Sequence, residues 1–126
     1  MSFVAVVAAL ALIEYIVIIL QTGRARQTYG VKAPATTGDP IFERHYRVQQ
    51  NTVEQLVVFF PALFLFASYA SPAAAGVLGL LFIVGRILYA RGYVADPEKR
   101  GPGFALSFGA NVILVIGALI GALVGH

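Results

Sequence analysis

The sequence predicts an all-α integral membrane protein, an antiparallel bundle of four transmembrane helices. Of its 126 residues, 59% are hydrophobic and 12% are charged, whereas a soluble domain is about half apolar and about a quarter charged. Four continuous apolar stretches each approach the roughly 20 residues that cross the hydrocarbon of a bilayer. They run over Phe3–Leu20, Val53–Tyr69, Ala73–Tyr89 and Phe104–Val124. None of them alternates apolar and polar residues with the two-residue period of a barrel strand, so each is expected to be helical.

The first two helices are separated by a polar loop. The first helix is expected to end near Arg26, and it carries a single carboxylate, Glu14, near its middle. Asp39 followed by Pro40 is a pattern typical of an N-cap with proline at the first helical position, so the second helix should begin there. Pro61 lies well inside this helix and predicts a kink.

The third and fourth helices follow in the same way. Ser71 and Pro72 repeat the cap and proline after a very short turn, and the third helix should end near Tyr93. A loop over 96–103 leads into the fourth helix, where Asn111 is expected to make an interhelical hydrogen bond. Three glycines at four-residue spacing predict close helix contact; they are Gly117, Gly121 and Gly125. We expect one domain over residues 1–126.

The basic residues predict how the bundle is oriented. All nine lie in or beside the first and third loops, whereas the second loop, 68–76, has no charge. They are Arg24, Arg26, Lys32, Arg44, Arg47, Arg86, Arg91, Lys99 and Arg100. The positive-inside rule then places both basic loops in the cytoplasm and both termini outside. The chain has no extension or retrieval signal, so we expect a multi-pass protein of a bacterial inner membrane.

Two kinds of chemistry receive no support from the sequence. Cysteine is absent, so any thiol chemistry must come with the substrate. His45 and His126 are far apart in the chain and predict no metal site. The basic residues follow the membrane topology rather than forming one patch, so a nucleic-acid partner is not expected.

A polar stripe opens the second helix. At 100° per residue, Asn51 lies about 40° and Glu54 about 20° from Arg47, so the three share one stripe. A bilayer makes such groups costly by several kcal/mol unless they face protein, water or a polar ligand. Four short helices have too few walls to enclose them, so we expect an oligomer. The stripe therefore predicts a polar binding site at the membrane edge.

More polar residues are expected at the same depth. On the third helix, Arg86, Tyr89 and Tyr93 share a stripe about 60° wide. Arginines, a carboxylate, an amide and two phenols suit a small ligand with several carboxylates and one ammonium group. Glutathione fits this description, and a cationic neighbour would favour its nucleophilic thiolate.

Three segments of the chain resemble a known family. They are FERHYRVQQNTVE from Phe42, RILYARGY from Arg86 and PATTG from Pro34. Together they are similar to the signatures of the MAPEG family, membrane-associated proteins in eicosanoid and glutathione metabolism, and nearest to its leukotriene C4 synthase and microsomal glutathione transferase branch. The similarity extends over nearly the whole chain, including helix number and loop lengths.

The resemblance implies a homotrimer that binds glutathione, as co-substrate, between subunits on the cytoplasmic side. Arg100 aligns with the family arginine that stabilises the thiolate and is the expected catalytic residue. Seven residues are expected to hold glutathione: Arg26, Arg47, Gln49, Asn51, Glu54, Tyr89 and Tyr93. Two positions depart from the leukotriene C4 synthase pattern, since Gln27 replaces a second arginine and Gln55 replaces a tyrosine.

Simpler interpretations remain for the same residues. The stripe of the second helix can be an interhelical polar network, and the two tyrosines can belong to an interfacial aromatic belt. Arg100 can be a surface charge, Arg44 a brace for the bundle, and Arg86 a structural partner for an acid or a helix end. Glu14 is expected to face a neighbouring helix or the oligomer axis.

Three functions are therefore compared. The leading one is a glutathione transferase for lipophilic electrophiles that enter from the membrane, with peroxidase activity toward lipid hydroperoxides as an extension. The alternative is a non-catalytic lipid-binding or scaffold protein of the same fold. A small drug exporter also has four helices and a carboxylate in the first, as Glu14 is here. However, the polar groups lie at the membrane edge rather than in its core, which argues against export.

Overall fold

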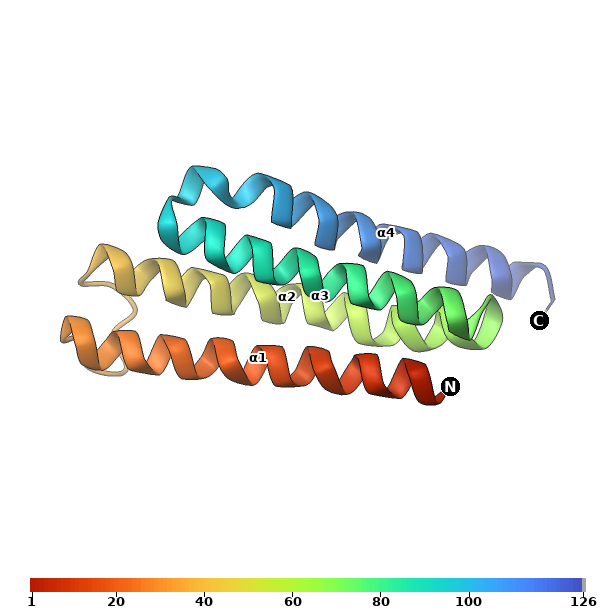
Figure 1. Cartoon of the computed structure of the whole chain (residues 1–126), viewed down its shortest axis with the longest axis horizontal. Helices are drawn as coiled ribbons and strands as arrows, with labels where there is room; N and C mark the ends of the chain where they lie inside the picture. The colour runs from red at the N-terminus through yellow and green to blue at the C-terminus, as the bar shows by residue number, and fades with distance from the viewer. Residues whose placement is uncertain (126) are drawn as a thin grey trace.

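The chain is a bundle of four long helices. The computed structural model describes residues 1–125, with α1 at Ser2–Tyr29, α2 at Pro40–Tyr69, α3 at Pro72–Ala95 and α4 at Gly101–Leu123. A short 3-10 helix, η1 at Pro97–Arg100, leads into α4. Successive helices run antiparallel (Figure 1). All four are long and apolar enough to cross a membrane, which confirms the predicted membrane helical bundle.

The two basic loops lie at one end of the bundle. Figure 1 shows the α1–α2 loop and η1 together at that end, while both ends of the described chain and the α2–α3 turn lie at the other. This separation agrees with the one-sided distribution of basic residues. Which end faces the cytoplasm stays a prediction.

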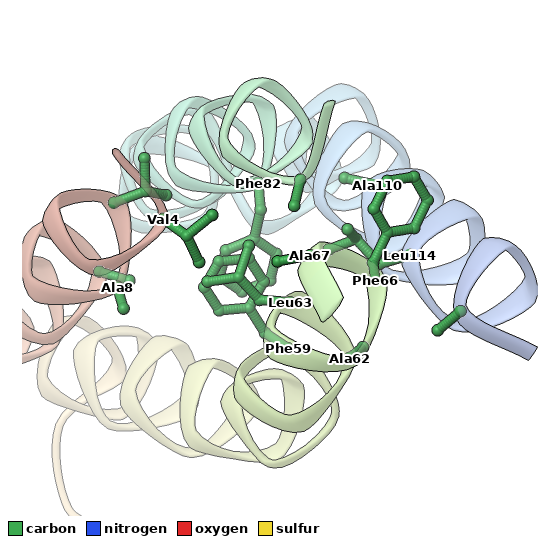
Figure 2. Packing of buried hydrophobic residues seen from close by; sticks show 14 of the residues in the cluster. Val4, Ala8, Phe59, Ala62, Leu63, Phe66, Ala67, Phe82, Ala110 and Leu114 are labelled. Carbon is green, nitrogen blue, oxygen red and sulfur yellow. The ribbon is translucent and has the colours of Figure 1, made fainter. Parts of the chain in front are cut away.

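α2 and α3 form the centre, because each packs against the other three long helices. Their contact is built on Phe59 and Phe82, whose rings stack at a centroid separation of 4.1 Å and an interplanar angle of 9°. Figure 2 shows Leu63 of α2 and Val4 of α1 packed around this pair, with Leu114 of α4 nearby. Large apolar side chains also cover the outside, as lipid contact requires.

The predicted caps are present, and α1 is longer than predicted. Asp39 accepts hydrogen bonds from the amides of Ile41 and Phe42, both at 2.9 Å, and Ser71 accepts from Ala74 at 3.1 Å. α1 continues past Arg26 because Gly30, at φ 70°, supplies the left-handed cap. α2 stays one helix through Pro61, and α3 ends two residues beyond Tyr93.

Close helix contacts depend on glycines, only some of which were predicted. Gly121 packs against the carbonyl oxygen of Tyr69 and Gly117 against the ring of Phe66, so the fourth helix does approach another helix, α2. The third predicted glycine, Gly125, has no atom near its Cβ position. No sequence pattern indicated Gly103, where a Cβ would collide with the backbone nitrogen of Tyr89.

Candidate functional site

The polar stripe of α2 lies on the outside of the single chain. Arg47 and Glu54 are exposed and Asn51 is half-buried. No side-chain hydrogen bond joins Arg47 or Glu54 to another residue in the described range 1–125. Charged groups at this depth need a ligand, water or a protein partner. Within one chain, therefore, only Asn51 of the stripe belongs to an interhelical polar network, and Arg47 and Glu54 remain open to a ligand, to water or to another subunit.

Arg86 supports this surface from inside the bundle. Its side chain is 0% exposed, and its Nη2 donates to Oδ1 of Asn51 at 2.7 Å and to Oγ1 of Thr52 at 2.8 Å. Its Nη1 donates to Oγ of Ser107 on α4 at 3.3 Å. Arg86 was predicted to be structural, with an acid or a helix end as partner. The role is as expected, but the partners are an amide and two hydroxyls.

Tyr89 lies between the polar residues of α2 and those of α3 and η1 that were predicted to bind glutathione. It is buried, and its ring centroid is 4.2 Å from Cζ of Arg86 and 5.6 Å from the ring of Tyr93. Arg47 of α2 and Arg100 of η1 lie in the neighbourhood of its phenol. α2, α3 and η1 therefore each contribute to one polar region beside Tyr89.

Arg100 closes this region at the loop end. It is exposed at the last position of η1, where its Nη1 donates to the carbonyl oxygen of Pro97 at 2.7 Å. A guanidinium has five N–H donors, so this bond leaves several for a ligand. The close approach of Gly103 to Tyr89 fixes how near the start of α4 comes to α3.

Arg26 and Gln49 lie apart from the other predicted residues. Arg26, on α1, donates to the carbonyl oxygen of Ala35 at 2.7 Å and places its Cζ 4.7 Å from the ring centroid of Phe42. Gln49 lies about 200° around α2 from Arg47 and is next to Tyr15 of α1. A single chain thus brings Arg47, Asn51, Tyr89, Tyr93 and Arg100 to one region, with Glu54 on the same face of α2, whereas Arg26 and Gln49 face the α1 side.

Several neighbouring polar residues hold the helices together. Asn111 of α4 donates to Oε1 of Gln55 at 3.1 Å and to its carbonyl oxygen at 3.2 Å, which confirms the predicted interhelical bond. Gln55 is thereby engaged in α2–α4 packing. Arg44 braces α2 against α3 by donating to the carbonyl oxygen of Val94 at 3.0 Å.

No metal site accompanies these residues in the described range, since no three His, Cys, Asp or Glu side chains gather there. His45 lies near the start of α2, and His126 lies outside the described residues.

The fold and this face define a class: a membrane four-helix bundle with an arginine- and tyrosine-rich surface at its basic end. The sequence model of the MAPEG family matches residues 4–120. The chain therefore belongs to the MAPEG family.

Individual relatives agree with this assignment. An uncharacterized protein of Synechocystis is 52% identical over 94% of this chain and 87% of its own length. Human microsomal glutathione S-transferase 2 is 46% identical over 82% of this chain and 69% of its own length. Bovine leukotriene C4 synthase is 35% identical over the same two shares. Two of these three names thus refer to glutathione or leukotriene chemistry.

Proposed function

We propose that this protein is a membrane glutathione transferase, which activates glutathione as its thiolate and conjugates it to lipophilic electrophiles. The observation that carries the proposal is the stripe of Arg47, Asn51 and Glu54, with both charged residues exposed, beside Tyr89 at the basic end of the bundle. Its donors and single carboxylate match the carboxylates and ammonium group of glutathione. The similarity to human microsomal glutathione S-transferase 2 supports the same conclusion.

Each residue of the site has a role in this proposal. Arg47 binds a carboxylate of the tripeptide and Glu54 binds its ammonium group, while Asn51, Tyr89 and Tyr93 donate hydrogen bonds. Arg100 lies near the sulfur and stabilises the thiolate, as cations do for thiols in proteins. The thiolate sulfur then bonds to the electrophilic carbon. In a substitution the leaving group departs from that carbon, and in an addition to an activated double bond the neighbouring carbon takes up a proton. The same thiolate can attack the terminal oxygen of a lipid hydroperoxide, which breaks the O–O bond and releases the lipid alcohol after protonation. The glutathione sulfenic acid that remains reacts with a second glutathione to give the disulfide and water.

The working form in this proposal is a homotrimer. Arg26 and Gln49 lie on the α1 side of the chain, away from the other six residues. A neighbouring subunit that packs its α1 side against the stripe would bring both to the site. This packing would also cover Arg47 and Glu54, which the single chain leaves exposed. We further propose that the protein lies in a bacterial inner membrane with both basic loops cytoplasmic.

Calorimetric titration of the detergent-purified protein tests the proposal. Glutathione and S-hexylglutathione are titrated separately, and the oligomer is sized by native mass spectrometry of the same sample. We expect saturable binding near one molecule per subunit, tighter for the hexyl conjugate because its chain buries apolar surface. If a trimeric, folded sample binds neither ligand, the proposal is wrong and the lipid-binding or scaffold function replaces it.

A further inference from the structure

A cavity between α1 and α3 opens on the side of the bundle. Its volume is about 560 Å³, within the range of roughly 300–1,000 Å³ that is typical of pockets for small ligands. Along α1 it extends from Gln21 to Glu14, a depth of about 10 Å at about 1.5 Å per residue. Its edge is exposed on both helices, since Val17 is 46% and Ile87 is 44% exposed. None of the residues predicted to bind glutathione or stabilise its thiolate lines it.

The lining of this cavity changes from polar to apolar with depth. At the basic end of the bundle it holds Arg91 and Gln21, both exposed, and the half-buried His45. Toward the middle of the helices it is formed by apolar side chains such as Val17 and Ile87. An occupant that matches both parts has a polar group at the membrane edge and a hydrocarbon chain below it.

The floor of the cavity offers no atom to such an occupant. Arg86 is 0% exposed, and both carboxylate oxygens of Glu14 are buried. These two groups lie in the same neighbourhood, so their opposite charges offset each other. The contacts of a polar head group therefore depend on the side chains at the basic end, of which Arg91 is the cation.

The guanidinium of Arg91 is available for a ligand. Within residues 1–125 it makes no side-chain hydrogen bond or ion pair, unlike the four arginines that donate to other residues. These four are Arg26, Arg44, Arg86 and Arg100. A guanidinium has five N–H donors and binds phosphate oxygens in a forked geometry. Arg91 therefore favours an anionic head group.

A second exposed arginine lies on the same side of α1. Arg24 follows Val17 by seven residues, which places it about 20° from Val17 around the helix and one turn nearer the basic end than Gln21. It also makes no side-chain hydrogen bond within residues 1–125. Positive charge from both helices thus lies at the basic end of the cavity.

The cavity is turned away from the neighbouring subunit of the proposed trimer. In that trimer α1 meets its neighbour with the flank that carries Arg26. Arg26 lies about 140° around α1 from Gln21 and about 180° from Val17. The flank of α1 that lines the cavity therefore faces the bilayer, and a lipid rather than a second copy of the chain can enter it.

We propose that the α1–α3 cavity binds an anionic phospholipid, with its phosphate at Arg91 and Gln21 and one acyl chain between Val17 and Ile87. Basic pockets between transmembrane helices are a known type of site for such head groups. A choline head group carries its own cation, which Arg91 repels, so a lipid with net negative charge binds more tightly. The exposure of the cavity to lipid rests on the proposed trimer, whereas binding of glutathione is not required.

Tryptophan fluorescence tests the site, because the chain contains no tryptophan. Ile87→Trp places a reporter at the edge of the cavity, and Ala105→Trp places a control on α4, where the side chain is exposed and lies outside the cavity. α3 and α4 touch where Gly85 packs against Ser107. Each reporter lies two residues from this contact toward the basic end, so both report from about the same depth.

Both full-length proteins are reconstituted in vesicles of phosphatidylglycerol and phosphatidylcholine in varied proportions. The acyl chains of one lipid or the other are brominated, because bromine quenches tryptophan. The dependence of quenching on composition gives the association constant of phosphatidylglycerol relative to phosphatidylcholine at each reporter.

We expect this ratio to be about fivefold at Ile87→Trp and below about twofold at Ala105→Trp, since one arginine near an anionic lipid contributes about this factor. Adding Arg91→Gln to the Ile87→Trp protein should lower the ratio to that of the control. Adding Lys32→Gln, which removes an exposed charge from the α1–α2 loop at the same end, should leave the ratio unchanged.

Four results would overturn the proposal. Equal ratios at the two reporters would show general attraction to the basic end, and a folded Arg91→Gln protein that keeps the ratio would exclude Arg91. Loss of the preference on adding soluble glycerol phosphate would show a site for free phosphate. Quenching of Ile87→Trp by neither lipid would show that a second copy covers this face. If Arg91→Gln does not fold, the two reporters still decide, because both keep Arg91. Glutathione binding by the same samples is measured separately, so its absence does not affect the result.

Discussion

Arg86 holds Asn51 in one orientation. Its Nη2 donates to Oδ1 of Asn51 at 2.7 Å, and because a guanidinium has no acceptor, the amide oxygen must be the atom that faces it. The NH₂ group of Asn51 is therefore turned away from Arg86. A buried arginine on α3 thus determines which hydrogen-bonding group α2 presents at the proposed site.

The first prediction concerns this amide. Asn51→Asp keeps an acceptor for Arg86, so thermal stability should stay at or above that of the wild type. It removes the NH₂ donor and adds a negative charge beside an anionic ligand, so glutathione affinity should fall by about tenfold or more. Thermal unfolding and calorimetry on the same sample measure both effects. Unchanged affinity would show that Asn51 does not contact the ligand.

Glu54 is predicted to bind the ammonium group of glutathione. Glu54→Ala should weaken binding by about 2–4 kcal/mol, the scale for removing one partner of a desolvated charge pair. Glu43→Ala is the control, because its carboxylate accepts from the amide of Gly38 near the start of α2, several turns away. If both variants bind glutathione as the wild type does, Glu54 has no ligand role.

Arg100 is predicted to act on the sulfur more than on affinity. Arg100→Ala should leave the dissociation constant for glutathione within a few-fold, but should abolish the ultraviolet difference absorbance of the bound thiolate at neutral pH. Lys99→Ala removes an exposed positive charge from the same turn of η1 and should keep the signal. A full thiolate signal in Arg100→Ala would exclude the proposed role.

Gly103 is predicted to set the distance between α3 and α4. In Gly103→Ala the new Cβ would overlap the backbone nitrogen of Tyr89 and come within 2.7 Å of the carbonyl oxygen of Gly85. Relieving this overlap should cost about 1–3 kcal/mol of unfolding free energy and weaken glutathione binding by moving Tyr89. Gly109→Ala, where no atom lies within 4 Å of the new Cβ, should be at least as stable as the wild type. Equal melting temperatures for the two variants would contradict the prediction.

The sequence was sufficient for the architecture. Long apolar runs, two N-caps followed by proline and a one-sided set of basic residues are local signals, and each corresponds to a feature of the structure. The predicted helix ends were less accurate than the predicted number and order of helices. The first polar residues after the apolar run do not end α1. It extends to Tyr29, because the left-handed cap formed by Gly30 decides where the helix stops.

The site was only partly predictable. Helical periodicity gathered Arg47, Asn51 and Glu54, because angles around one helix follow directly from residue spacing. It could not supply the partners of Arg86, since Asn51 and Ser107 belong to other helices and their proximity depends on packing. The cavity between α1 and α3, which Glu14 and Ile87 help to line, was not predictable for the same reason, although an isolated carboxylate such as Glu14 within an apolar helix indicates that something polar lies nearby.

Both ends of the described chain lie at the bundle end away from the basic loops (Figure 1). One copy can therefore be joined to the next by a flexible linker that never recrosses the bilayer. A gene encoding three fused copies would allow a single copy to carry Arg26→Ala and another to carry Arg47→Ala. Counting the glutathione sites that survive in each arrangement would show whether one binding site draws its side chains from one copy or from two.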